Sequence, residues 1–252
     1  MDDCDLALML GDNFYNRGVT APKNGEWDLA FDHKFEKPYA GLGRLDMWAV
    51  AGNRDWYKGR ESIDTQVAYS ERSDRWRMLA YDYAVPNLPE WLRIYGIDTV
   101  LIDTNVDIGQ LDRAEAALCG APAWKILFGH HAVFTTGRHA DRNGVVPTMA
   151  KRVLPLIESC EVQLYLSGHD HHQEHLVADG FHQIIQGASG KTRPVGVRSD
   201  DSEAVQRFAA RQYGFAILRI RRDAIDVIFY GYPPGKRDDF RVTCEVRIEA
   251  DS

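Results

Sequence analysis

The 252-residue chain has no long apolar run, no low-complexity tract and no excess of basic residues. Its apolar runs, such as Leu6–Leu10 and Ile126–Phe128, are far shorter than the ~18 residues that a membrane-spanning helix needs. Because 44% of the residues are hydrophobic, the composition excludes a disordered protein. The net charge of −7 argues against binding to nucleic acid through a basic face. We therefore expect no membrane and no nucleic-acid partner.

Cysteines are few and irregularly spaced. The four of them, Cys4, Cys119, Cys160 and Cys244, form no Cys-x-x-Cys pair. Disulfide frameworks and zinc sites usually show regular spacing, so we expect ordinary buried thiols. A chain of this length can bury a sizeable core without disulfides or a structural metal.

Short apolar runs alternate with helical patterns as far as residue 167. Runs that end in Gly or Asp are typical of strands covered on both faces. We expect strands at Leu6–Leu10, Met47–Val50, Trp91–Tyr95, Thr99–Ile102, Lys125–Phe128 and Val162–Leu166. We expect helices at Glu61–Ser70, Leu111–Leu118 and Val146–Ser159. This alternation predicts an α/β architecture.

The last third of the chain favours antiparallel strands. They are expected at His182–Ile185, Phe215–Ile220, Ala224–Tyr230 and Arg241–Ile248, the last as an edge strand. The polar residues 197–212 predict a surface loop or a short helix. The chain has no internal repeat and no long linker, so we expect a single domain over residues 1–252.

Four short motifs each follow a predicted strand. They are Gly11-Asp12-Asn13-Phe14-Tyr15, Gly52-Asn53-Arg54-Asp55, Gly129-His130-His131 and Gly168-His169-Asp170-His171-His172. Each one alone is typical of a turn or a surface cluster. Together they place metal-competent side chains at the carboxyl ends of strands, the edge where open α/β sheets bind ligands. Mixed oxygen and imidazole donors suit Fe, Mn or Zn better than Ca.

These motifs resemble those of the calcineurin-like metallophosphoesterases. The form of Gly11–Tyr15, with Gln66–Ser70 and Arg75-Trp76, is similar to the purple acid phosphatases of the small tartrate-resistant type. The resemblance implies a four-layer α/β/β/α sandwich of two mixed β-sheets flanked by helices. It also implies hydrolysis of a small phosphomonoester at a dinuclear metal centre, with attack by metal-bound hydroxide.

The same resemblance assigns ligands to two metal ions. Asp12 would bridge the ions, and Tyr15 and His171 would complete the site of the first, ferric ion. The second ion, Fe(II), Zn or Mn, would be held by Asn53, His130 and His169. Two such cations clamp a phosphate, lower the pKa of bound water and neutralise charge on the phosphate oxygens.

The second motif departs from the family pattern at its third residue. The family usually has a histidine there, which contacts phosphate and protonates the leaving group, whereas this chain has Arg54. Arginine binds phosphate through a bidentate fork but does not release a proton at neutral pH. We therefore expect Arg54 to bind substrate and stabilise charge. His131 is the nearest candidate for the proton transfer and a substrate contact, and His139 is a second candidate or a solvated loop residue.

The family's earlier motif, Asp-x-Gly or Asp-x-His after a preceding strand, is not found in this sequence. Asp3 does not replace it, because the strand between Asp3 and Asp12 separates them by about 30 Å. We expect the domain as written to lack its first strand and one ligand of the first ion. A mis-set start codon or a truncated sequence explains this better than a one-metal or degenerate protein, because the other ligands are present.

Two other functions stay open. A phosphodiesterase or nucleotidase on the same fold would use the same metal clamp. A catalytically degenerate metal-binding protein would explain Arg54 and the missing first motif. The first residues form no signal peptide, so the sequence as written predicts a cytoplasmic protein, and a missing upstream signal would make it an exported one.

Overall fold

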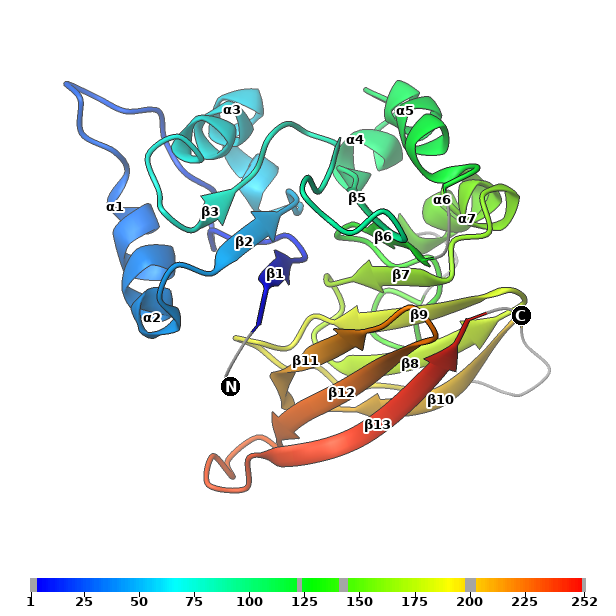
Figure 1. Ribbon diagram of the computed structural model, residues 1–252. Coiled ribbons are helices and arrows are strands. Elements are labelled where there is room, and N and C mark those ends of the chain that lie inside the picture. Colours follow the sequence, from blue (N-terminus) through cyan, green and yellow to red (C-terminus); the bar gives the residue numbers. More distant parts are fainter. Residues whose placement is uncertain (1–3, 122–123, 141–144, 198–202, 251–252) are drawn as a thin grey trace.

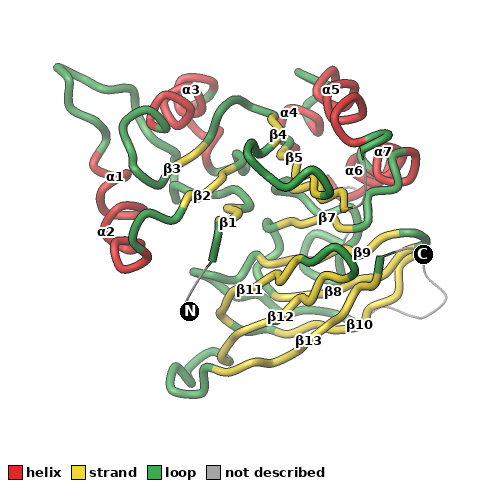
Figure 2. The backbone as a smooth tube through the Cα atoms, viewed as in Figure 1, coloured by secondary structure: helices red, strands yellow, loops and turns green. Residues whose placement is uncertain are grey.

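The structure is a computed structural model that describes residues 4–121, 124–140, 145–197 and 203–250 (Figures 1 and 2). The first strands are β1 (Leu6–Met9), β2 (Asp46–Ala49), β3 (Trp76–Arg77), β4 (Tyr83–Ala84), β5 (Leu92–Gly96), β6 (Trp124–Phe128) and β7 (Leu164–Ser167). The later strands are β8 (Gln173–Ala178), β9 (Phe181–Gln186), β10 (Ala204–Ala210), β11 (Tyr213–Ile220), β12 (Ala224–Tyr232) and β13 (Arg241–Glu249).

The helices are mostly short. They are α1 (Leu29–Phe31), α2 (Lys37–Tyr39), α3 (Arg60–Tyr69), α4 (Thr99–Asp103), α5 (Gly109–Leu118), α6 (Val145–Arg152) and α7 (Leu154–Ser159). A π-helical turn (Asp32–Glu36) joins α1 to α2, and 3₁₀ turns occupy Ala40–Leu42 and Asp55–Lys58. No helix in the described part of the chain is long and apolar enough to cross a membrane.

The strands form one large mixed sheet and two small sheets. The large sheet has the order β10-β8-β9-β7-β6-β5-β4, and the small ones are β1-β2-β3 and β11-β12-β13. Alternate side chains of the large sheet point to opposite faces, as Ile126 and Leu127 do. Helices α4–α7 cover one face, and both small sheets pack on the other.

The layers follow from where the buried apolar residues lie. One cluster joins the large sheet to α4–α7 through Leu127, Tyr165, Ile102, Leu118 and Ile157. The other joins the large sheet to the small sheets and to α1–α3 through Ile126, Leu164, Trp48, Val227, Phe31 and Ile63. The resulting order is helices, sheet, sheets and helices, which confirms the predicted four-layer α/β/β/α sandwich (Figure 1).

The predicted secondary structure of two segments was wrong. Thr99–Ile102 forms the helix α4 rather than a strand, because the Asp98 side chain accepts the backbone N–H groups of Val100 and Leu101 and caps a helix. Within residues 197–212, expected to be a loop or short helix, β10 pairs with β8 as an edge strand, and residues 198–202 lie outside the described ranges. The expected helix at Val146–Ser159 is divided into α6 and α7, with Pro155 in the first turn of α7.

The expectation of four buried thiols was also wrong. Cys119 and Cys160 form a disulfide bond with a Cα–Cα distance of 4.4 Å. Each residue directly follows a helix, α5 and α7 respectively, and these two helices cover the same face of the sheet. Cys4 is exposed and Cys244 half-buried, and both are free.

Candidate metal centre

The four motif loops converge at one edge of the sheets. β1 runs parallel to β2, and β6 runs parallel to β7, so the carboxyl ends within each pair lie together. A Cβ atom on Gly52 would lie 2.2 Å from the backbone nitrogen of Asp12. Gly11 has a φ of 82°, and a Cβ there would lie 2.6 Å from Nδ1 of His130. Only glycine permits so close an approach of these loops.

Asp12 lies at the centre of the predicted ligand set. Its Oδ2 accepts the Tyr15 hydroxyl at 2.7 Å, and that hydroxyl lies 3.1 Å from Nε2 of His171. Its Oδ1 lies 3.3 Å from Nε2 of His130. The φ of Asp12 is 57°, a strained value for a residue with a side chain, and such strain often marks functional positions. The two carboxylate oxygens thus face two separate groups of ligand atoms.

The second group of ligand atoms surrounds Nε2 of His130. Oδ1 of Asn53 and Nδ1 of His169 each lie 3.1 Å from this nitrogen. Nδ1 of His130 lies 2.8 Å from the carbonyl oxygen of Leu10, which can only accept, so Nδ1 carries the hydrogen and Nε2 a lone pair. That lone pair faces Oδ1 of Asp12, a second acceptor. Facing acceptors of this kind suit a cation, so the residues present fit a metal ion.

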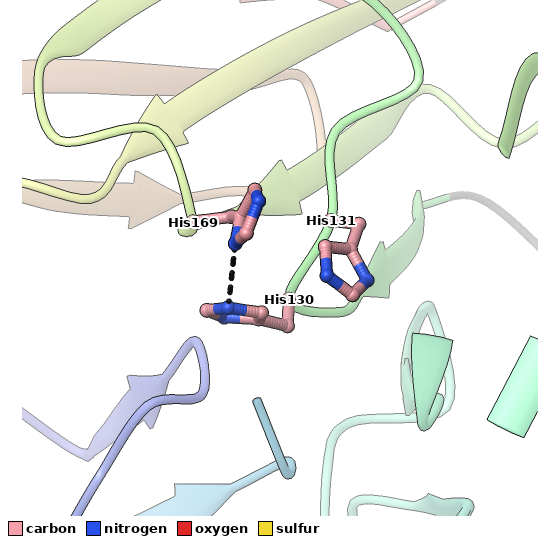
Figure 3. A group of neighbouring side chains, drawn as sticks. All are labelled: His130, His131 and His169. Carbon is pink, nitrogen blue, oxygen red and sulfur yellow. Dashed lines mark hydrogen bonds between the residues drawn. The ribbon is translucent and has the colours of Figure 1, made fainter. Parts of the chain in front are cut away.

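His131 adds a third imidazole to this second group. Figure 3 shows the rings of His130, His131 and His169 gathered together, and their ligand nitrogens lie within 4.8 Å of one another. Nδ1 of His131 lies 2.9 Å from the Thr99 hydroxyl. Burial, and then the neighbouring His130 and His169, lower the pKa of His131 well below its ordinary value. His131 is therefore a neutral, buried ring beside the predicted ligands.

His139 reaches the site from the loop that follows β6. Its ring centroid lies 4.1 Å from that of His169, and its Nδ1 lies 2.7 Å from Oδ1 of Asp170. Burial acts to raise the pKa of Asp170, but hydrogen bonds from His139 and Thr135 outweigh it and lower this pKa to about 2. Asp170 is thus ionised and orients the imidazole. The His139 side chain remains 37% exposed, so it is accessible from solvent.

Arg54 lies at the exposed rim of the same edge. Its backbone N–H donates to Oδ1 of Asp12 at 2.7 Å. Burial and the Asp12 charge raise the pKa of Tyr15, and the positive charge of Arg54 acts in the opposite direction. The guanidinium charge therefore lies near the predicted ligands of the first ion. No ion pair of Arg54 is found among the described residues.

Two supporting carboxylates were present in the motifs but were given no role by sequence reasoning. Asp170 orients His139, and the fully buried Asp55 accepts hydrogen bonds from backbone N–H groups of two motif loops. The only signal for either was its place inside a motif, between or after metal-competent residues. Thr99, whose hydroxyl lies beside Nδ1 of His131, is outside the four motifs and was predicted to begin a strand, so its sequence position did not indicate this contact.

Comparison with known proteins identifies the family. The profile described as "Calcineurin-like phosphoesterase" matches residues 2–173. The chain belongs to this family. Among curated proteins it is 25% identical over 256 residues to purple acid phosphatase 7 of Arabidopsis thaliana, covering 90% of this chain and 73% of that protein. It is 29% identical over 212 residues to tartrate-resistant acid phosphatase type 5 of Sus scrofa, covering 75% of this chain and 60% of that protein.

Solved structures support the fold of this family member. The purple acid phosphatase PPD1 from yellow lupin (Lupinus luteus) superimposes with a TM-score of 0.71 at 14% identity, covering 98% of this chain and 47% of that one. GAP50, described as the anchor in the inner membrane complex of Plasmodium, gives 0.74 at 20% identity, covering 97% and 78%. At these identities the likeness establishes the shared fold alone.

Proposed function

We propose that this family member is a metal-dependent phosphoric ester hydrolase that acts on small phosphomonoesters, as acid phosphatases do. The observation that carries the proposal is the continuous set of contacts around Asp12, which joins Tyr15 and His171 on one side to His130 on the other. Family membership and the acid phosphatase relatives support phosphoester hydrolysis as the reaction class.

The residues divide into two metal sites that share Asp12. Tyr15 and His171 would hold a first ion, for which we propose Fe(III), through the phenol oxygen and Nε2. The second ion, Fe(II), Zn or Mn, would be held by Asn53, His130 and His169. When bound, the ions would supply Lewis-acid activation of water and neutralise charge on the phosphate.

A neighbouring backbone group holds His130 in a form that can bind a metal ion. The Leu10 carbonyl holds the Nδ1 hydrogen of His130 and so directs the Nε2 lone pair inward. Such a second hydrogen bond fixes the orientation and tautomer of a metal-binding histidine. His130 therefore presents Nε2 in the form that a cation requires.

We propose that His139 donates the proton to the leaving group. It is partly exposed beside His169, and the Asp170 carboxylate, 2.7 Å from its Nδ1, orients the ring. His131 is less suited to this step because it is buried and neutral. Arg54, at the rim, would bind the substrate phosphate and stabilise its charge without transferring a proton.

The test combines metal content with substrate preference. The purified protein, loaded with Fe and Zn or Mn, should hold two ions per chain and hydrolyse p-nitrophenyl phosphate faster than bis-p-nitrophenyl phosphate. Asp12→Ala should lose both metal binding and turnover, because no other described carboxylate faces both groups of ligand atoms, whereas the exposed Asp74→Asn should lose neither. A preference for the diester would favour a phosphodiesterase, and bound metal without turnover would favour a degenerate metal-binding protein.

A further inference from the structure

The segment that joins β9 to β10 runs alongside the metal centre. We call residues 187–197 the β9–β10 segment. Its backbone is fastened to the fourth motif loop: Gly187 N–H donates to the His172 carbonyl at 3.2 Å, and Arg193 N–H donates to the His171 carbonyl at 2.7 Å. Gly196 N–H donates to the Thr136 carbonyl at 2.8 Å. The segment is thus held against the loop that carries two predicted ligands.

This fastened segment carries two cations, Lys191 and Arg193. The Arg193 backbone N–H donates to the His171 carbonyl, and Lys191 lies two residues before Arg193, so both cations adjoin the loop that carries His171. Neither forms an ion pair with another described residue. Lys191 is exposed and Arg193 is half-buried.

Cations without an ion-pair partner among the described residues are electrostatically unfavourable beside a cation-binding centre. Each would repel an ion held by Tyr15 and His171, in a protein whose overall charge is −7. The repulsion is relieved if an anion lies between the segment and the centre. The phosphate to be hydrolysed already has two metal ions and Arg54 as candidate partners, so two more cations exceed what one phosphate group requires.

We propose that Lys191 and Arg193 form a subsite for a second phosphate group of the substrate. This proposal rests on the phosphomonoesterase function and specifies its substrate class, a phosphomonoester whose leaving group carries another phosphate. The chemistry is ordinary hydrolysis: a water oxygen bonds to phosphorus, the P–O bond to the leaving group breaks, and the leaving oxygen takes a proton to become the alcohol while the water loses one. Lys191 and Arg193 act only on the second phosphate, which stays attached to the alcohol.

Binding decides the proposal even without turnover. Calorimetry compares phenylphosphonate with benzene-1,3-bisphosphonate, two ligands that are not hydrolysed and differ only in the second anion. The metal-loaded wild type should bind the bisphosphonate at least about tenfold more tightly at low salt, because charge-assisted contacts to phosphate oxygens are strong. Lys191→Gln/Arg193→Gln should reduce that ratio to within about twofold and leave phenylphosphonate binding unchanged.

The control removes the same charge elsewhere. Lys236 and Arg237 are exposed in the turn between β12 and β13, so Lys236→Gln/Arg237→Gln should keep the wild-type ratio. Turnover of phenyl phosphate and 1,3-phenylene bisphosphate, compared per ester bond, should give the same order of preference. Equal binding of the two phosphonates by the wild type, or an unchanged ratio in the Lys191/Arg193 variant, would overturn the subsite. Tight bisphosphonate binding without turnover would instead count against the phosphomonoesterase and leave the subsite standing.

Discussion

The carboxylate of Asp55 accepts the backbone N–H of Phe14 through Oδ1 at 3.0 Å, which fastens the loop after β2 to the loop after β1. Its Oδ2 accepts the backbone N–H groups of Asn13 at 3.1 Å and of Gly52 at 2.8 Å. Asp55 is fully buried. One side chain therefore sets the spacing between the loop that holds Asp12 and the loop that holds the second motif.

Replacing Asp55 with Asn tests this fastening role. The amide offers a single acceptor oxygen, so at least one buried N–H would lose its partner, which typically costs about 1–3 kcal/mol. We expect Asp55→Asn to lower the unfolding temperature and to weaken metal binding at least about tenfold, measured by thermal unfolding and metal titration. Asp74→Asn, at an exposed position, is the matched control. If Asp55→Asn is destabilised but binds metal as tightly as the wild type, Asp55 contributes to folding and not to metal binding.

Tyr15 can be tested by colour. A phenolate bound to Fe(III) gives a charge-transfer band in the visible range, as the resemblance to purple acid phosphatases implies. The Tyr15 hydroxyl lies 2.7 Å from Oδ2 of Asp12 and 3.1 Å from Nε2 of His171, so the three atoms can share one ion. We expect Tyr15→Phe, loaded with ferric iron, to lose the visible absorption of the wild type. An unchanged band in Tyr15→Phe would remove Tyr15 from the ligand set. As a control, Tyr57→Phe, at an exposed tyrosine, should keep the visible band.

His175 makes the stability of the fold depend on pH. Burial, followed by the positive charges of His182 and Arg207, lowers the pKa of His175 to about 3. Between pH 6.5 and 3 the unfolded chain binds a proton at this residue and the folded chain does not, so stability falls as the pH falls. From pH 7 to 5 the expected loss from this residue is about 2 kcal/mol.

Denaturant unfolding at several pH values measures that contribution. His175→Gln should unfold with a shallower pH dependence between pH 7 and 5 than the wild type does. His33→Gln, at an exposed histidine, should keep the wild-type slope. Identical slopes for the wild type and His175→Gln would contradict the assignment.

The strands and the site edge were predictable because their signals are local. Apolar runs such as Lys125–Phe128 ending in glycine place metal-competent residues at strand ends, and β6 and β7 carry two of the four motifs there. Thr99–Ile102 was mistaken for a strand because a short apolar run does not distinguish a buried helix from a strand. The Cys119–Cys160 bond joins residues 41 positions apart, a pairing set by helix packing and not by spacing.

The supporting shell of the site was less predictable than its ligands. Asp170, Asp55 and Thr99 act through side chains or backbone groups that are distant in sequence, such as His139 and Phe14. A motif reveals which atoms could bind a metal ion, but it does not reveal which neighbour fixes their orientation. The choice between His131 and His139 as proton donor depends on burial, which only the packed fold provides.

The proton donor can be identified by the leaving group. Poor leaving groups such as alkoxides need a proton, whereas p-nitrophenolate departs without one, and general acid catalysis typically contributes ~10²–10⁴-fold. We expect His139→Gln to lower kcat for an alkyl phosphate by about 100-fold or more, and kcat for p-nitrophenyl phosphate by less than about tenfold. Asp170→Asn should shift the ratio in the same direction, because it removes the carboxylate that lies 2.7 Å from the imidazole.

The variants at the two histidines separate the alternatives. If His131 were the donor, His131→Gln would change the leaving-group ratio and His139→Gln would not. If His139 only packs on His169, His139→Gln would lower both rates equally and weaken metal binding as well. We expect only His139→Gln to lose the alkyl phosphate reaction selectively while keeping its metal content. The His139 ring is partly exposed and held by an ionised carboxylate, whereas His131 is buried and neutral.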